Sequence, residues 1–434
     1  MGTKLPATFE LNIEKLTPSG EGLGHFEGRP VYVFGVVPGD SVLVKPLKVS
    51  RRETKAAVVD VLKASVFRRL PKEEHFLSCA PYQILAEEKQ LEYKKELVKE
   101  IFRKKAEEAP APEVEIAVSS RFWNYRNKME FSFSADENGA LTLAFFQRFR
   151  HNRQYCVKNC AIAHERINQC AEEILIILRE KEITREQLKN IVFRYSYAQD
   201  QCLAALFVVD EQFPIFDVSA EGLTGWMIIY SDPLSPAAKT TRILHAQGDD
   251  CLVEEIGGLS LKYFYDSFFQ INPPTFEKIV TFLRKNIQPG HTLVDFYSGV
   301  GTIGFALAKH FQTVYSLESV EASLTAAREN VERNALNNVA VIAGEAEKPE
   351  LRQMVGLANT LICDPPRSGL HPKILKAILE YVPAQFAYVS CNPITQAADY
   401  AALKEKYNVS AWHLFDLYPQ TPHVESVLIL ERKS

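Results

Sequence analysis

Cys391 and Glu425 stand at the ends of two predicted strands, where side chains can act on a bound molecule. Cys391 follows an apolar run and precedes the polar turn Asn392-Pro393, whereas Glu425 opens the last apolar run of the chain. A cysteine inside a strand, such as Cys363 or Cys202, is typical of an inert core. A thiol at a strand end can instead act as a nucleophile, and a nearby carboxylate can act as a base.

Asp364 occupies a similar position after another apolar run. It begins the sequence Asp-Pro-Pro-Arg at 364–367, and the two prolines stiffen the turn that holds it. The carboxyl ends of parallel strands meet at one edge of a sheet, where ligands bind. We therefore expect Asp364 to face the same crevice as Cys391 and to hold a substrate edge or orient a cofactor.

A glycine-rich turn at 299–304 follows a fourth apolar run and matches the pattern G-x-G-x-x-G. Glu318 stands 19 residues after the first glycine, where an acidic residue reaches ribose hydroxyls. This spacing disfavours a mere packing turn and suggests a dinucleotide site. Asp295 and Tyr297, however, precede the first glycine, and a carboxylate there would repel a pyrophosphate but tolerate a sulfonium cation. The sequence thus favours S-adenosylmethionine over NAD.

A thiol, a carboxylate and a methyl donor together serve one reaction, the methylation of a pyrimidine at C5. C5 is too weak a nucleophile to take a methyl group unaided, but addition of a thiolate to C6 activates it. A base must then remove the C5 proton before the thiolate leaves. These roles suit Cys391 and Glu425. Because the target base must leave its stack, we expect single-stranded RNA or a flipped base in RNA.

The elements that must position these residues predict an α/β fold in three parts. Residues 262–434 alternate strands with helices, which indicates a doubly wound, Rossmann-like parallel sheet closed by an antiparallel hairpin edge. Residues 1–66 contain short runs between glycine and proline turns, which is typical of a small β-barrel. Residues 67–261 are expected to form a mixed α+β domain. It starts with a helix over 86–108 whose apolar residues share one face, with lysines and glutamates covering the rest.

The composition is typical of a cytoplasmic protein without a membrane span. The N-terminus lacks the apolar core of a signal peptide, and 8 cysteines in 434 residues are too few for a disulfide scaffold. The net charge is −4, yet residues 1–70 and 121–160 each carry +4. A polyanion-binding surface or chance clustering on solvated faces would explain this segregation equally well. We expect a monomer.

Four segments resemble motifs of the RNA uracil-5-methyltransferases: DFYSGVGTIG, DPPRSG, YVSCNP and YPQTPHVESV. The resemblance implies an S-adenosylmethionine-dependent enzyme with Cys391 as nucleophile and Glu425 as base. The cofactor contacts that it implies are Gln270, Tyr297, Glu318 and Asp364, with Glu345 a weaker candidate.

The resemblance also implies how RNA is held. Residues 1–66 resemble the TRAM domain of many family members, and they carry Lys45, Lys48, Arg51, Arg52 and Lys55 on and between the later predicted strands. The stretch WNYRNKMEFSF resembles the family's central RNA-contacting segment, with Arg126 and Lys128 as phosphate or base contacts. A TRAM-bearing chain favours ribosomal RNA as the substrate, with transfer RNA as the alternative.

Many family members hold an iron–sulfur cluster with four cysteines, and this chain departs from that pattern. Glu73 and Tyr82 stand where two of those cysteines are expected, which leaves Cys79 and the distant Cys160. Two further cysteines, at 156 and 170, lie near Cys160 but at no standard cluster spacing. We therefore predict no cluster and no metal in the active site. Packing of Phe76, Tyr82 and Ile84 is expected to replace the cluster.

Two other functions compete with uracil methylation. A cytosine-5 RNA methyltransferase uses the same thiol addition but needs a proton donor at N3, a role for which Asp364 is ambiguous. A non-catalytic RNA-binding protein with a relic methyltransferase domain is the other, and the presence of both Cys391 and Glu425 speaks against it.

Overall fold

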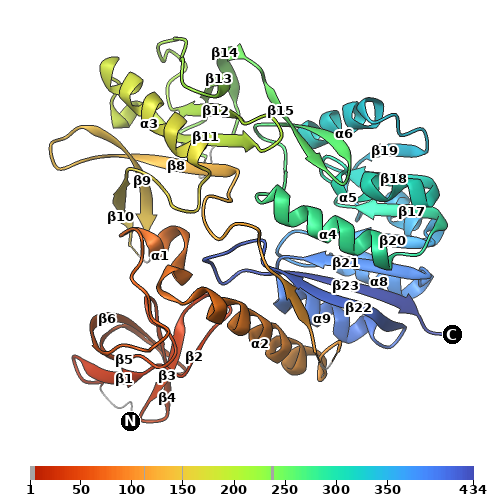
Figure 1. Cartoon of the computed structure of the whole chain (residues 1–434), viewed down its shortest axis with the longest axis horizontal. Coiled ribbons are helices and arrows are strands. Elements are labelled where there is room, and N and C mark those ends of the chain that lie inside the picture. Colours follow the sequence, from red (N-terminus) through yellow and green to blue (C-terminus); the bar gives the residue numbers. More distant parts are fainter. Residues whose placement is uncertain (1–4, 112, 149, 236–238) are drawn as a thin grey trace.

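The structure is a computed structural model that describes residues 5–111, 113–148, 150–235 and 239–434. Its N-terminal sheet lies at the lower left of Figure 1, its central sheet above, and its C-terminal sheet at the right. None of the helices in these described ranges is long and apolar enough to cross a membrane.

The N-terminal sheet contains six strands in the order β1-β5-β6-β4-β3-β2. They are β1 (Phe9–Asn12), β2 (Lys15–Leu16), β3 (Gly22–Phe26), β4 (Arg29–Val33), β5 (Ser41–Val49) and β6 (Thr54–Lys63). Alternate side chains of these strands point inward and form one apolar cluster. The sheet curls so that β3 approaches β1. The approach is close, since a Cβ on Gly24 would lie 2.2 Å from the carbonyl oxygen of Asn12. The TRAM-like barrel remains a prediction for this region.

The central sheet contains seven strands in the order β10-β9-β8-β11-β12-β13-β14. They are β8 (Lys128–Ala135), β9 (Leu141–Gln147), β10 (Arg150–Val157), β11 (Leu188–Ser196), β12 (Gln201–Val208), β13 (Leu223–Tyr230) and β14 (Arg242–Gly248). All neighbours are antiparallel except β12 and β13. The helix α3 (Glu165–Glu180) packs its apolar face on this sheet, and η2 (Arg185–Gln187) leads into β11. A separate hairpin, β15 (Cys251–Ile256) with β16 (Leu259–Phe264), follows.

The C-terminal sheet contains eight strands in the order β19-β18-β17-β20-β21-β23-β22-β7. They are β7 (Glu115–Ala117), β17 (Gly290–Phe296), β18 (Phe311–Glu318), β19 (Val339–Ala343), β20 (Thr360–Cys363), β21 (Gln385–Ser390), β22 (Tyr407–Phe415) and β23 (Glu425–Arg432). The run from β19 to β21 is parallel, as expected for strands separated by helices. The predicted α/β class with a Rossmann-like C-terminal sheet is therefore confirmed.

Helices surround this sheet on both faces (Figure 1). They are α4 (Pro273–Asn286), α5 (Thr302–Leu307), α6 (Glu321–Arg333), α7 (Pro349–Arg352), α8 (Pro372–Tyr381) and α9 (Pro393–Leu403), with η3 (Ala308–His310) and η4 (Gln353–Leu357). Two apolar clusters lie between helices and sheet, one on each side.

One detail of the predicted sheet is wrong. β22 and β23 do form an antiparallel hairpin, but β23 lies between β21 and β22, and the short β7 pairs with β22 to form the edge. The helix α2 (Glu87–Ala106) also packs on this part of the molecule, where the Phe102 ring centroid lies 5.2 Å from that of Trp412. Segments before residue 118 thus support the C-terminal sheet. The domain boundaries at 66/67 and 261/262 remain predictions.

Candidate active site

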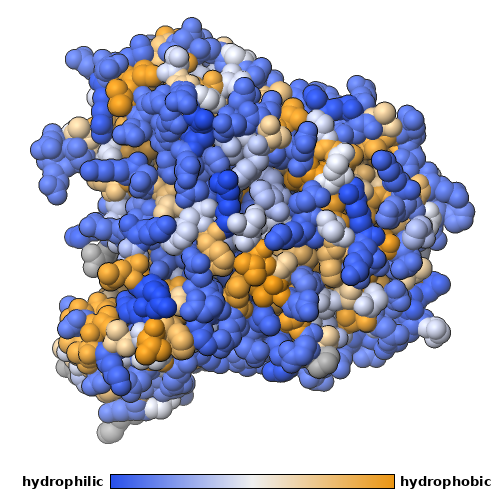
Figure 2. Space-filling view, viewed as in Figure 1, coloured by the Kyte–Doolittle hydropathy of each residue, from blue (hydrophilic) through white to orange (hydrophobic). Residues whose placement is uncertain are grey.

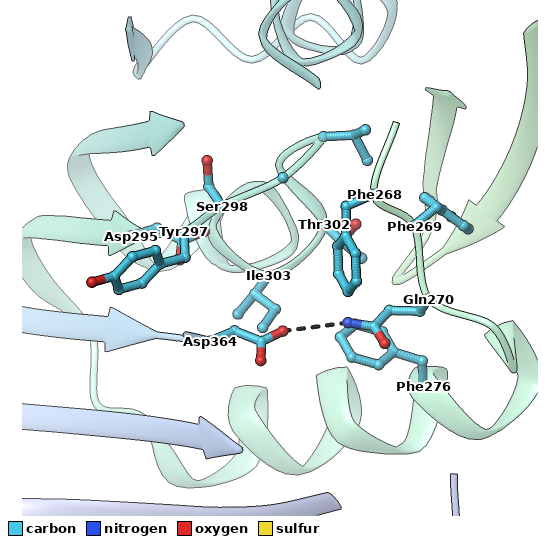
Figure 3. A pocket seen from close by; sticks show the side chains of 12 residues that line it. Phe268, Phe269, Gln270, Phe276, Asp295, Tyr297, Ser298, Thr302, Ile303 and Asp364 are labelled. Carbon is cyan, nitrogen blue, oxygen red and sulfur yellow. Dashed lines mark hydrogen bonds between the residues drawn. The ribbon is translucent and has the colours of Figure 1, made fainter. Parts of the chain in front are cut away.

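The glycine-rich turn forms one wall of a cavity at the carboxyl end of β17 (Figure 3). The backbone reverses tightly, with left-handed φ angles of 64° at Tyr297, 58° at Gly299 and 94° at Gly301. A Cβ on Gly301 would lie 2.2 Å from the ring of Phe305, so a larger residue does not fit. The turn thereby holds Tyr297 and Ser298 in the cavity wall.

Three of the four predicted cofactor residues, Gln270, Tyr297 and Asp364, line this cavity. Gln270 and Asp364 point toward each other in Figure 3, and Gln270 Nε2 donates to Asp364 Oδ2 at 3.3 Å. The fourth, Glu318, lies at the end of β18, and its Oε2 accepts from the N–H of Gly299 at 2.9 Å. Glu318 therefore stabilises the glycine-rich turn from the neighbouring strand.

Two buried carboxyls in the cavity wall resist ionisation. Burial raises the pKa of Asp295 to about 8, although its Oδ2 accepts from the N–H of Gly304 at 2.9 Å. Burial also raises the pKa of Asp364 to about 7, and the hydrogen bond from Gln270 opposes that shift. A cation in the cavity would favour the ionised form of both groups. The cavity is thus better suited to a sulfonium than to a pyrophosphate.

A further carboxylate near the cavity is one that the sequence did not single out. Glu347 Oε1 accepts from the hydroxyl of Tyr297 at 3.2 Å, whereas the predicted candidate Glu345 is exposed. Both follow β19 in the same turn, two residues apart, so a pattern search alone could not tell which one faces Tyr297.

Cys391 lies directly after β21 and lines a neighbouring cavity together with Arg367, Asn392 and His423. The side chain of Asn392 fixes this turn, because Nδ2 donates to the carbonyl of Arg367 at 2.7 Å and Oδ1 accepts from Ile394 N at 3.2 Å. Burial raises the pKa of the Cys391 thiol to about 12, and the carboxyl of Glu425 adds to that effect, while Arg367 opposes it. The thiol is therefore protonated at neutral pH before substrate enters.

Glu425, the first residue of β23, is 3% exposed. The hydroxyl of Tyr418 donates to its Oε2 at 3.3 Å, but Oε1 is buried and has no hydrogen-bond partner among the described residues. Burial, together with the charge of Asp364, raises the pKa of Glu425 well above its usual range. A buried acceptor without a partner is uncommon in proteins and leaves one oxygen available for a substrate proton.

The register of the sheet brings the thiol and this carboxyl together. The last pair of β21 and β23 is Ser390 with Ser426, and this register, continued by one residue, would set Cys391 opposite Glu425. Residues opposite each other in an antiparallel pair lie roughly 5 Å apart at Cα and point to one face. Asp364 acts electrostatically on both groups, and it also lines the cavity beside the glycine-rich turn. The structure thus brings the predicted nucleophile and base to the edge of the predicted cofactor site.

A buried polar network holds the loop that leads into Glu425. Lys94 of α2 donates to Asp416 Oδ1 at 2.5 Å and to the carbonyl of Tyr418 at 3.1 Å, and both charged side chains are fully buried. Gln90, one turn earlier, exchanges hydrogen bonds with Gln420 through Nε2 at 2.9 Å and Oε1 at 3.1 Å. The sequence predicts that lysines and glutamates cover the helix outside its apolar face. Lys94 is instead buried, because its partner Asp416 comes from a loop far away in the sequence.

Replacing Lys94 by Met should lower the free energy of unfolding by about 3–5 kcal/mol, because Asp416 would stay buried without a counter-charge. Chemical denaturation of variant and parent chain, followed by circular dichroism under the same conditions, measures the free energy of unfolding. The control is Lys105→Met on the exposed side of the same helix, which should change stability by less than about 0.5 kcal/mol. Equal effects of the two substitutions would show that the buried pair is not important for stability.

Tyr82 packs where the resemblance led us to expect a cluster ligand. It is 2% exposed and shares an apolar cluster with Leu16, Val37 and Ile84, against which Phe76 also packs. Tyr82→Ser should therefore lower the melting temperature by several degrees, because it leaves a cavity of aromatic size. Tyr82→Phe keeps the ring and should cost far less. A melting temperature unchanged by Tyr82→Ser would argue against packing as the replacement for the cluster.

The two predicted RNA contacts of the central segment are half-buried. Arg126 Nε donates to the carbonyl of Lys128 at 2.9 Å. Burial and the neighbouring Arg194 lower the pKa of Lys128 to about 8. Their contact with RNA remains a prediction.

Comparison with known proteins identifies the family of this chain. The model of the family described as tRNA (Uracil-5-)-methyltransferase matches residues 86–433. The chain belongs to this family. Membership confirms the recognition made from the motifs, the enzyme class of RNA uracil-5-methyltransferase and the S-adenosylmethionine cofactor.

Full-length relatives and a solved structure extend the comparison. An uncharacterized RNA methyltransferase of Clostridium tetani is 31% identical, with 98% of each chain covered. One of Caldanaerobacter subterraneus is 30% identical, with 97% of this chain and 98% of the relative covered. The Pyrococcus abyssi tRNA (uracil-54, C5)-methyltransferase, solved with S-adenosyl-L-homocysteine, superposes with a TM-score of 0.79 at 23% identity, covering 97% of this chain and 100% of that one. The last similarity establishes a shared fold along the whole chain.

Proposed function

We propose that this enzyme methylates C5 of a uridine in structured RNA, with Cys391 as nucleophile and Glu425 as base. The observation that supports the proposal is the register of β21 and β23, whose last pair, Ser390 with Ser426, adjoins Cys391 and Glu425. The charge of Asp364 also acts on Glu425. The unpartnered Oε1 of Glu425 supports the assignment, because a base needs a free oxygen that faces its proton.

The proposed reaction follows from the two groups. S-adenosylmethionine, when bound, supplies an electrophilic methyl group. The Cys391 thiol first gives up its proton to solvent, and the resulting thiolate adds to C6 of the uracil, while the electrons of the C5–C6 double bond move toward O4. C5 then forms a bond to the methyl carbon, whose bond to sulfur breaks. Glu425, which must be ionised at this step, takes the C5 proton through Oε1, the double bond re-forms, and Cys391 leaves as a thiolate.

The polar pair Gln270 and Asp364 links the two halves of the proposed site. Asp364 lines the cofactor cavity and acts electrostatically on Cys391 and Glu425, so it can orient either the methyl donor or the uracil edge. Gln270, Tyr297 and Glu318 are the other proposed cofactor contacts. Arg367 is the cation beside Cys391 that favours its thiolate.

The N-terminal sheet is the proposed RNA-binding surface. Lys45, Lys48, Arg51 and Arg52 on and after β5 are exposed. Apolar side chains gather over the same sheet at the lower left of Figure 2. A cleft of about 670 Å³ between this sheet and the central one combines aromatic side chains with Lys48 and Arg148. Cations beside aromatic rings suit a single strand with unstacked bases.

RNA affinity should therefore fall steeply with salt, with a slope of about −0.7 per phosphate contact on a single strand. The double variant Lys48→Glu/Arg51→Glu should flatten that slope and weaken binding, whereas Lys376→Glu, exposed on α8, should not. Filter binding over a salt series measures both. A slope that the double variant leaves unchanged would place the RNA elsewhere.

We propose ribosomal RNA as the substrate class, with transfer RNA as the alternative. We also propose that the enzyme acts as a monomer in the cytoplasm. The Pyrococcus abyssi protein, described as a tRNA enzyme, makes transfer RNA the alternative. Incubation of unmodified ribosomal and transfer RNA with isotopically labelled methyl donor, followed by nucleoside mass spectrometry, decides between them. We expect labelled 5-methyluridine in ribosomal RNA. Label in 5-methylcytidine would overturn the uracil assignment.

A further inference from the structure

Three potential metal ligands converge at a place that the methylation chemistry does not use. The ligand atoms of Glu73, Cys79 and Cys160 all lie within 4.8 Å of one another. Cys79 closes the short helix α1 (Phe76–Cys79), whereas Cys160 follows β10 of the central sheet. Cys160 is buried, and the side chain of Glu73 is 8% exposed. Two thiols and a carboxyl from two distant segments thus meet in the interior.

These donors do not fit an iron–sulfur cluster of the kind implied by the family resemblance. Such clusters need four thiolates, and only two thiols meet here. Tyr82 packs in an apolar cluster, the exposed thiol of Cys156 lies against the carbonyl of Ala135, and Cys170 donates to the carbonyl of Glu221. A set of two sulfurs and one oxygen instead suits a single metal ion of the zinc class.

The spacing of the donors agrees with a single ion. Zinc lies about 2.3 Å from sulfur and about 2.0–2.2 Å from a carboxylate oxygen, so tetrahedral ligands stand roughly 3.5 Å apart. Cys79 Sγ lies 3.5 Å from Glu73 Oε1. In the metal-free chain the Cys79 thiol donates a hydrogen bond to Glu73 Oε1, and a bound ion would replace the proton of that thiol.

Hydrogen bonds from neighbouring groups hold the potential metal ligands in place. Gln83 Nε2 donates to Glu73 Oε1 at 2.8 Å, and Ala161 N donates to Oε2 at 2.8 Å. His75 Nε2 lies 3.0 Å from the carbonyl of Asn159, which can only accept, so Nε2 carries the ring proton. In the neutral ring, His75 Nδ1 then carries the lone pair that can bind a metal, and it lies 3.4 Å from Cys79 Sγ.

We propose that Glu73, Cys79 and Cys160 bind one zinc ion, with His75 Nδ1 or water as the fourth ligand. Binding releases the two thiol protons to solvent and leaves thiolates on the metal. The role is structural, because the ion would join the segment before α2 to the loop after β10 of the central sheet, and the site is independent of the proposed active site.

The test uses the full chain, stripped with a chelator and kept reduced. We expect one equivalent of Zn²⁺ to bind and to raise the melting temperature, and Co²⁺ in its place to show a thiolate-to-metal charge-transfer band. Cys160→Ser and Cys79→Ser should each weaken Zn²⁺ binding by about 100-fold or more, beyond the usual cost of losing an outer-shell partner. Glu73→Gln, which keeps the shape and the hydrogen bond from Ala161, should weaken binding without unfolding the chain.

The matched control is Cys156→Ser, since Cys156 is an exposed thiol close by in the sequence. It should bind Zn²⁺ as the parent chain does. Three results would overturn the proposal: no saturable Zn²⁺ binding, equal binding by the Cys160→Ser variant, or uptake of stoichiometric iron and sulfide with the absorbance of a cluster.

Discussion

Cys391→Ala should abolish RNA methylation while RNA affinity survives. Without the thiol, C5 of the uracil is not activated, so turnover should fall by several orders of magnitude, as it does when a nucleophile is removed from other enzymes. The RNA surface proposed on the N-terminal sheet does not include this residue, so binding should change little. Methyl transfer from labelled donor and a gel-shift titration measure the two properties on one preparation.

The matched control is Cys251→Ala, a partly exposed thiol on β15, away from both cavities. It should retain full turnover. Methylation that persists in Cys391→Ala would remove the nucleophile assignment. Loss of RNA binding together with turnover would show instead that Cys391 supports the fold of the RNA site.

Glu425→Gln should slow turnover by about 10²–10⁴-fold, the usual contribution of a general base. The step it blocks comes after methyl transfer, so the methylated RNA should accumulate covalently bound to Cys391. Denaturing gels with labelled donor measure this species. Rapid release of methylated RNA by the variant would show that another group removes the C5 proton.

The same substitution should make the chain more stable at high pH. Burial raises the pKa of Glu425 above that of the unfolded chain, so the folded state binds the proton more tightly. The stability that this group contributes is present below the unfolded pKa and is lost as the pH rises through the folded pKa. Glutamine carries no charge, so the advantage of Glu425→Gln should grow with pH. A stability difference that is independent of pH would contradict the statement that burial raises the pKa of Glu425.

The sequence predicted well which of the candidate residues lie at strand ends. Cys391, Asp364 and the glycine-rich turn follow strands of one parallel run, and parallel strands bring their carboxyl ends to a common edge whatever the details of packing. To predict that Cys391 lies near Glu425, one also needs the register that pairs Ser390 with Ser426. That register comes from strand pairing between segments separated by α9 and β22.

Other features depend on contacts that no local pattern records. Lys94 occupies a helix position typical of a solvated lysine, yet Asp416 meets it in the interior. β7 is a three-residue strand whose place at the sheet edge depends on β22. Glu345 and Glu347 share one turn, and only tertiary packing decides which of them meets Tyr297. In each case the partner lies far away in the sequence, where propensity and periodicity carry no information.

RNA that contains 5-fluorouridine at the target position tests the central claim most directly. Fluorine at C5 cannot be removed as a proton is, so the reaction should stop after thiol addition and methyl transfer. We predict a denaturant-stable complex that carries one methyl group, with the RNA attached to the peptide containing Cys391. A complex attached through another residue, or no covalent complex under conditions where uridine is methylated, would contradict the proposed mechanism.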